Sequence, residues 1–141
     1  MQRPPKSFEN TIIYKLVCND RMIPDIYIGH TTNFRYRQFA HKNSCYNSNH
    51  HNYNCTVYEF IRNNHGWENW RMEVLEECNC KNSTEARARE RFWIESLKPS
   101  LNVRIPNRTK KEYGTTYSKN YYQKNRDRIL KQKREKYHRL S

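Results

Sequence analysis

The chain has 141 residues, of which only 35% are hydrophobic, so it can build one domain with a small core and an appendage. No apolar run approaches the roughly 20 residues of a membrane-spanning helix, and the first residues lack the apolar segment of a secretory signal. We therefore expect a soluble intracellular protein, and its three glycines exclude a glycine-rich phosphate loop.

The net charge of +13 is concentrated at the C-terminal end. Residues 108–141 contain 12 Lys or Arg against 3 Asp or Glu, a net charge of +9, with tyrosines between them. Such a segment is typical of tails that bind polyanions, and the predicted partner is nucleic acid. A solvated tail that only keeps the protein in solution is the alternative.

Two β-rich runs open the domain, residues 11–18 and 26–30, joined by a short polar link. Together they predict an antiparallel hairpin. Asn33 can cap a helix that runs to about Lys42. Residues 43–54 are polar and rich in Asn and His, and we expect a loop there.

The rest of the domain alternates between helix and strand. Residues 57–61 suggest a second helix that ends at Gly66, and residues 70–75 alternate like a strand. Asn82 begins a capping-box-like sequence for a helix that runs to about Leu97. The expected fold class is α/β (α+β): a small, mainly antiparallel three-stranded sheet flanked by helices.

One residue of this last helix is unexpected. Its apolar stripe consists of Ala86, Trp93, Ile94 and Leu97, and Glu90 lies on the same stripe. A carboxylate on a core-facing stripe is costly unless it is paired or bound to a metal. The pattern predicts a partner for Glu90, either a metal ion or a structural ion pair with a cation such as Arg37.

The two predicted hairpin strands carry a motif pair that resembles the signature of GIY-YIG nucleases. Residues 12–14 read Ile-Ile-Tyr and residues 27–29 read Tyr-Ile-Gly. The stretch YIGHTTNFRYRQFAHK then carries Arg37 and His41, similar to the family's helix with an arginine and often a histidine. The departure is Ile12, where the family has a glycine, and it removes no proposed catalytic group.

The resemblance continues to about Val103. The stretch RERFWIESLKPSLN carries Glu90 and Asn102, similar to the family's metal-binding glutamate and the asparagine after a Leu-Lys-Pro-like turn. Each piece alone is weak, but the ordered set is specific. It implies a metal-dependent endonuclease that hydrolyses DNA phosphodiester bonds, with no small-molecule cofactor.

The resemblance also implies roles for the two tyrosines. Tyr14 would be the general base or would position the attacking water, and Tyr27 would orient the phosphate or the water. A free tyrosine has a pKa of about 10, so Tyr14 needs a helper. We expect that helper to be His30, next to Gly29, ahead of Lys15.

The remaining site residues follow in the same way. Arg37 would offset charge on phosphorus, and His41 would bind phosphate or orient its neighbours. Asn102 would support the site by hydrogen bonding. Glu90 would hold one divalent cation, Mg²⁺ or Mn²⁺, because such hard ions are often held by one or two carboxylates.

The expected organisation is a leader in residues 1–10, a nuclease domain in 11–106 and a basic DNA-binding tail in 107–141. The tail resembles extensions of some GIY-YIG proteins of large DNA viruses and mobile elements, and residues 125–140 could form a helix. Its phosphate contacts would be salt-dependent and mostly independent of sequence. The residues expected to make them are Lys110, Lys111, Lys119, Lys124, Arg126, Arg128, Lys131, Lys133, Arg134 and Lys136.

Two other functions stay open, a catalytically inactive DNA-binding module on the same scaffold and a zinc-stabilised interaction protein. A monomer has one site, so cutting both strands needs two events or a homodimer on DNA. Five cysteines without a signal peptide argue against a disulfide framework, and their spacing lacks the rhythm of common zinc modules. The zinc candidates are Cys45, His50, His51, Cys55, His65, Cys78 and Cys80.

Overall fold

The computed structural model describes residues 2–139, except for the side chains of residues 116–118 and 139. The chain divides into two compact units, Met1–Asn107 and Arg108–Ser141. The first unit holds a three-stranded sheet between helices, and the second contains one helix, α4 (Lys110–Arg139). The predicted α+β class is confirmed. Within the described residues, no helix has the length and hydrophobicity needed to cross a bilayer.

The sheet has the order β2-β1-β3, with every neighbouring pair antiparallel. Its strands are β1 (Thr11–Cys18), β2 (Ile26–Thr31) and β3 (Trp70–Cys78), so the predicted hairpin is confirmed and β3 is longer than expected. The pairing of β1 with β3 shifts register between Ile13 and Tyr14, which leaves Leu75 of β3 as the extra residue of a bulge. Bulges are common next to active sites, where they redirect side chains.

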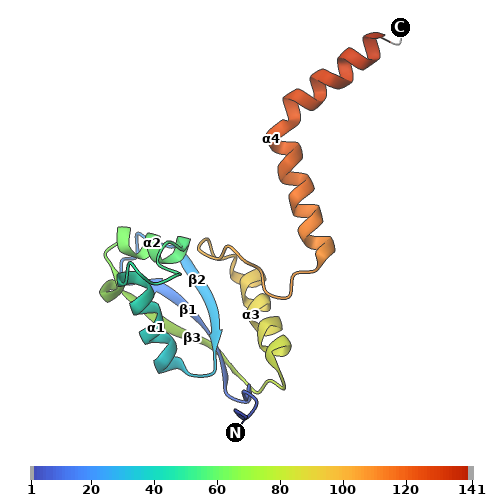
Figure 1. Ribbon diagram of the computed structural model, residues 1–141. Helices are drawn as coiled ribbons and strands as arrows, with labels where there is room; N and C mark the ends of the chain where they lie inside the picture. The colour runs from blue at the N-terminus through green and yellow to red at the C-terminus, as the bar shows by residue number, and fades with distance from the viewer. Residues whose placement is uncertain (1, 140–141) are drawn as a thin grey trace. The chain divides into compact units, whose positions relative to one another are not determined.

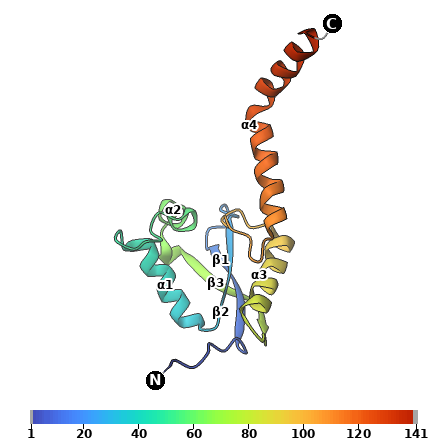
Figure 2. The same cartoon turned by 45° about the vertical axis from the view of Figure 1, so that its right-hand side comes forward.

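Helices cover the two faces of the sheet, as Figures 1 and 2 show. On one face, α1 (Phe34–Tyr46), α2 (Thr56–Asn63) and the short η1 (Trp67–Asn69) enclose the larger core. On the other, α3 (Ser83–Leu97) packs its Ile94 against strand isoleucines. Because side chains alternate along a strand, β1 contributes to both cores.

The helix starts were predicted correctly, since Asn33 and Asn82 accept hydrogen bonds from the backbone N–H groups of Tyr36 and Glu85, each at 3.0 Å. The predicted end of this helix, at about Lys42, was wrong, since α1 continues to Tyr46. Residues 43–46 are helical rather than part of the loop, because Cys45 is fully buried in the core. This tertiary contact outweighs the polar local composition.

Two further expectations need correction. Leu97, which we expected on the apolar stripe of this helix, is 41% exposed. The buried residues of α3 end at Ile94, and its last turn lies outside the core. In the tail, α4 begins at Lys110 rather than near residue 125, since only Gly114 interrupts an otherwise helix-compatible sequence. The predicted end of that helix, Leu140, lies outside the described residues.

Candidate active site

Tyr14 lies at the centre of the larger core and is fully buried. Its strand partner on β2 is Gly29, and the tyrosine ring lies directly over that position. A Cβ atom at residue 29 would lie 2.6 Å from the Tyr14 hydroxyl oxygen and 2.8 Å from its Cζ. Gly29 is therefore the residue that makes room for the hydroxyl at β2.

Two side chains of α1 hold the Tyr14 hydroxyl. His41 Nε2 lies 2.6 Å from the hydroxyl oxygen, and Arg37 donates its Nε–H to that oxygen at 3.1 Å. Residues four apart on a helix share a face, so Arg37 and His41 reach the same atom. The structure thus brings together three of the residues predicted for the site.

Burial controls the protonation of this group. It raises the pKa of Tyr14 above its ordinary value of 10, against the opposing effect of the Arg37 charge. Burial, with a further contribution from Arg37, lowers the pKa of His41 to about 3. Around neutral pH, the phenol and the imidazole are therefore both uncharged.

Tyr27 feels the charges of both Arg37 and the predicted metal ligand, Glu90. Burial and, to a smaller extent, the negative charge of Glu90 raise the pKa of Tyr27 to about 12, against the opposing effect of the Arg37 charge. The Glu90 side chain is only 13% exposed. Among the described residues its ion-pair partner is His30, whose Nδ1 lies 3.3 Å from Oε1 without hydrogen-bond geometry, and not Arg37.

His30 does not reach Tyr14, contrary to what we expected from the sequence. His30 pairs with Ile13 across the strands, whereas Tyr14 pairs with Gly29. Neighbouring residues of a strand point to opposite faces, so His30 is directed to the α3 side and meets Glu90. Lys15, the second candidate, lies 3.5 Å from Glu73. The nitrogen next to the Tyr14 hydroxyl belongs to His41.

Asn102 supports the free edge of β2. Its Oδ1 accepts the backbone N–H of Ile28, and its Nδ2 donates to the carbonyl of Ile28, both at 2.8 Å. The preceding Leu101 donates its backbone N–H to the carbonyl of Ile26 at 3.1 Å. These bonds pair backbone groups of an edge strand that carries Tyr27 and leave less of that edge open.

Two further residues of the group were not apparent from the sequence. Tyr58, 5% exposed on α2, places its hydroxyl 2.8 Å from His41 Nδ1. The Trp67 ring stacks on the His41 ring at 5.9 Å between centroids. Tyr58 fits the apolar pattern of its own helix. Its contact with His41 joins residues 17 positions apart, so no local sequence pattern predicts it.

The donor set fits a hard divalent cation with few protein ligands. Glu90 offers a nearly buried carboxylate, and His30, whose Nδ1 lies 3.3 Å away, makes no hydrogen bond to it. Mg²⁺ is commonly held by one or two carboxylates, with water and phosphate as the other ligands. No group of three His, Cys, Asp or Glu side chains suited to a metal occurs among the described residues.

The zinc candidates are instead engaged separately. His50 and His51 stack on each other, and His65 Nε2 lies 3.0 Å from Asp20. Cys78 and Cys80 are free thiols with their sulfur atoms 3.6 Å apart. These contacts give no support for a zinc centre in the part of the chain that the structure describes.

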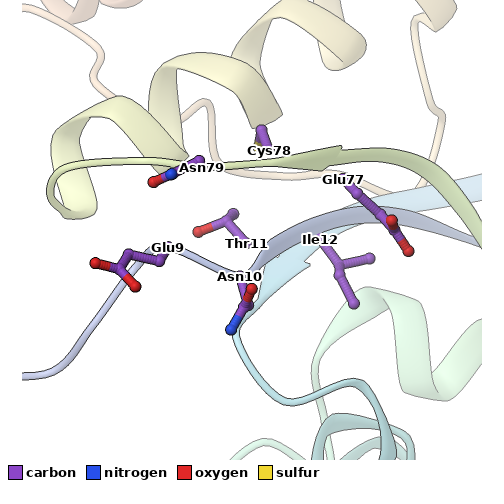
Figure 3. Close-up of a pocket in the computed structure, with 7 residues that line it drawn as sticks. All are labelled: Glu9, Asn10, Thr11, Ile12, Glu77, Cys78 and Asn79. Atoms are coloured by element: carbon purple, nitrogen blue, oxygen red, sulfur yellow. The ribbon is translucent and has the colours of Figure 1, made fainter.

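A hollow of about 310 Å³ lies beside the start of β1 and the end of β3 (Figure 3). It contains none of the residues predicted for the active site. Two carboxylates line it, so it is a poor receptor for phosphate. Its lining residues are Glu9, Asn10, Thr11, Ile12, Glu77, Cys78 and Asn79.

The second unit presents positive charge around the whole of α4. All ten tail residues predicted to contact phosphates lie on this helix and are exposed. Its hydrophobic residues form no continuous stripe, so the helix lacks the apolar face of one that packs on a protein core. This distribution suits a polyanionic partner.

Comparison with known proteins gives a family match over most of the first unit. A family model described as the GIY-YIG catalytic domain matches residues 10–103. The match includes all seven residues predicted for the catalytic site and ends before α4. A comparison with curated proteins and one with solved structures each gave no match.

Proposed function

The chain belongs to the GIY-YIG family of nucleases, which are phosphodiesterases, and we propose that it is a metal-dependent endonuclease that hydrolyses DNA. The observation that carries this proposal is the hydroxyl of Tyr14, held by Arg37 and His41 at β2. Tyr27 feels the charges of both Arg37 and Glu90 on α3. One site therefore offers groups for water, phosphate and a cation.

Arg37 is the phosphate ligand in this proposal. Its guanidinium is always charged and is therefore suited to offset the charge that develops on phosphorus. It also contacts Tyr14 and lowers the pKa of His41. When the guanidinium moves onto a phosphate, it leaves the Tyr14 hydroxyl and no longer lowers the pKa of His41 as strongly. Substrate binding thus makes His41 a better proton acceptor, while Tyr14 loses an effect that lowers its pKa.

Tyr14 then passes its phenolic proton to His41 Nε2 and takes a proton from the water that attacks phosphorus. In the resting site Tyr14 is protonated, because its pKa lies above 10 and that of His41 is about 3. A difference of this size excludes a resting phenolate. Proton transfer must therefore accompany attack on phosphorus, after Arg37 has moved. This assigns His41 the helper role that the sequence suggested for His30.

Glu90 holds the divalent cation, for which we propose Mg²⁺ or Mn²⁺. GIY-YIG nucleases typically use a divalent metal. Such an ion supplies positive charge next to the phosphate and the leaving oxygen. Tyr27 orients the phosphate or the water beside Glu90, and Asn102 keeps β2 in place.

Cleavage assays on duplex, flap and branched DNA with Mg²⁺ or Mn²⁺ test the proposal. Glu90→Ala should abolish cleavage, while Glu95→Ala, an exposed glutamate of the same helix, should not. Likewise Arg37→Ala should abolish it, while Arg35→Ala, exposed on α1, should leave it. If the wild-type chain leaves every DNA form intact with both metals, the enzymatic proposal fails. Retained DNA affinity in that case would favour a binding module.

A further inference from the structure

Two side chains of metal-binding type, His30 and Glu90, meet on the α3 side of the sheet. His30 lies on β2 directly after Gly29, and Glu90 lies on α3. The Nδ1 atom of His30 is 3.3 Å from Oε1 of Glu90, and the two side chains are 23% and 13% exposed. The fold thus brings an imidazole nitrogen and a carboxylate oxygen together from elements that are far apart in the sequence.

The Nδ1 atom of His30 is shielded from solvent and has no hydrogen-bond partner among the described residues. Buried side-chain nitrogens are in large majority paired, and an ion or a water is a common partner where the protein offers none. The pair of His65 and Asp20 shows the contrast, because His65 Nε2 lies 3.0 Å from Asp20 Oδ2 in a hydrogen bond at the surface. An ordinary ion pair accounts for His65 but leaves Nδ1 of His30 without a partner.

The separation of the two atoms suits two ligands of one cation. Small divalent cations bind oxygen and nitrogen at about 2.0–2.2 Å, and in an octahedral shell neighbouring ligand atoms therefore lie about 3 Å apart. Each ligand then directs its lone pair at the ion and not at the other ligand. A short N–O distance without hydrogen-bond geometry results, and His30 and Glu90 have both features.

We propose that His30 is a second protein ligand of the active-site cation, which it binds through Nδ1 beside Glu90. The inference rests on the proposed function in that it concerns the same metal. Carboxylate ligands suit Mg²⁺ and Mn²⁺, whereas an imidazole ligand favours transition metals. His30 therefore shifts the preference of this site from Mg²⁺ toward Mn²⁺, relative to a site in which Glu90 is the sole protein ligand.

A structural ion pair between His30 and Glu90 is the alternative, and it predicts the opposite effect on metal affinity. In an ion pair, His30 competes with the metal for the Glu90 carboxylate, so removing the imidazole should leave Mn²⁺ binding unchanged or make it tighter. If His30 is a ligand, removing it should weaken Mn²⁺ binding. His30→Phe makes the comparison, because it keeps an aromatic ring on β2 and removes both nitrogens.

The test uses the full chain and Mn²⁺ without DNA. Pulsed EPR of the bound ion detects a directly bound nitrogen, and ¹⁵N labelling of the histidines identifies it as an imidazole nitrogen. We expect this coupling in wild type and its loss in His30→Phe. Calorimetric titration should show Mn²⁺ binding at least about 10-fold weaker in His30→Phe, because even the outer-shell partners of metal ligands contribute that much. The loss of affinity for Mg²⁺ should be smaller.

The matched control is His65→Asn, which removes the imidazole of the surface pair, and asparagine tolerates the positive φ of 77° at that position. It should keep the nitrogen coupling and the Mn²⁺ affinity of wild type. If His30→Phe fails to fold, His30→Gln should also lose the imidazole coupling.

Three results would overturn the proposal: wild type that binds no Mn²⁺ at millimolar concentrations, bound Mn²⁺ without nitrogen coupling, or His30→Phe with wild-type affinity. Cleavage assays keep this inference apart from the proposed function. A wild-type chain that binds Mn²⁺ through His30 but cuts no DNA would support the ligand and defeat the nuclease. Cleavage with a bound ion that shows no nitrogen coupling would do the reverse.

Discussion

At the scale of single residues, the site depends on side chains that are fully buried and closely packed. Tyr14 and His41 have no exposed surface, and both nitrogens of His41 have hydroxyl partners. The position of the Tyr14 hydroxyl also requires a residue without a side chain at Gly29. Small changes at these residues should therefore affect the rate as well as the stability of the fold.

Gly29→Ala should reduce kcat by about 100-fold, because displacements of about 1 Å at a reacting group cost rates of that order. The added Cβ would meet the Tyr14 hydroxyl oxygen at 2.6 Å, so the ring must shift. Steady-state cleavage of a DNA oligonucleotide measures the effect. The control is Gly114→Ala, where nothing lies within 4 Å of the new Cβ. A Gly29→Ala enzyme with wild-type kcat would contradict this steric account.

His41 should make the fold sensitive to acid. Its pKa is about 3 in the folded chain against an ordinary value of 6.5, so between these values only the unfolded chain binds the proton. The free energy of unfolding should therefore fall as pH falls below about 6.5, by up to about 1.4 kcal/mol per pH unit from this residue. The Tyr14 and Tyr58 hydroxyls and the Arg37 charge surround the ring.

Urea titrations between pH 4.5 and 7.5 measure this dependence in wild type and His41→Gln. Carboxylates whose pKa is lowered in the folded chain, such as Glu73 and Glu76, contribute a slope of the same sign, but they are present in both proteins. The difference between the two slopes isolates His41. Equal slopes would show that the imidazole does not resist protonation in the fold.

At the scale of elements, the site lies where β2, the edge strand, meets residues that follow α3. β2 carries Tyr27 and Gly29, and β1 pairs with only one of its edges. Asn102 reproduces on the other edge the paired donor and acceptor of a neighbouring strand. Arg37 on α1 and Glu90 on α3 lie on helices that cover opposite faces of the sheet. The charges of both residues act on Tyr27.

Asn102→Ala should reduce both stability and rate, because it leaves the N–H and carbonyl of Ile28 without these partners. We expect a loss of about 1–3 kcal/mol in the free energy of unfolding. We also expect kcat to fall about 10-fold because β2 is less firmly held. Asn64→Ala removes a comparable bond, to the carbonyl of Phe60 at 2.8 Å, away from the site. That control should lose stability only, and an equal loss of rate in both variants would refute the role of β2.

At the scale of the whole molecule, chemistry and charge lie in different units. Residues of Met1–Asn107 form the site, while the tail carries a net charge of +9. A helix with charge on all sides suits backbone phosphates, which lie along every DNA sequence, better than one groove pattern. We therefore expect the tail to set affinity and the first unit to set the rate of cleavage.

The triple variant Lys124→Gln, Lys131→Gln, Lys133→Gln should weaken the salt dependence of DNA binding. The slope of log affinity against log salt should fall by roughly 0.9 for each phosphate that the tail no longer neutralises. Fluorescence anisotropy over a range of NaCl concentrations measures it. The matched control replaces the same three lysines with arginine and should keep the slope. Loss of kcat at saturating DNA in the glutamine variant would contradict the division of roles.

The sequence by itself determined the order of the elements, because that information is local. Strand runs, helix caps and the Glu90 position follow from the periods of strands and helices and from short-range hydrogen bonds. The same locality explains the confirmed resemblance to the GIY-YIG family, which rests on short motifs in a fixed order. The charge of the tail could also be predicted from the sequence, because it follows from composition alone.

Only the tertiary structure decided which side chains meet. Strand pairing placed Gly29, and not His30, opposite Tyr14, and it sent His30 toward Glu90 instead. Burial of Cys45 extended α1 against its polar local sequence. The contact of Tyr58 with His41 depends on α2 packing against α1, a long-range event that neither helix encodes alone. Pairing register and packing are properties of the whole fold, and for that reason these contacts were not readable from the sequence.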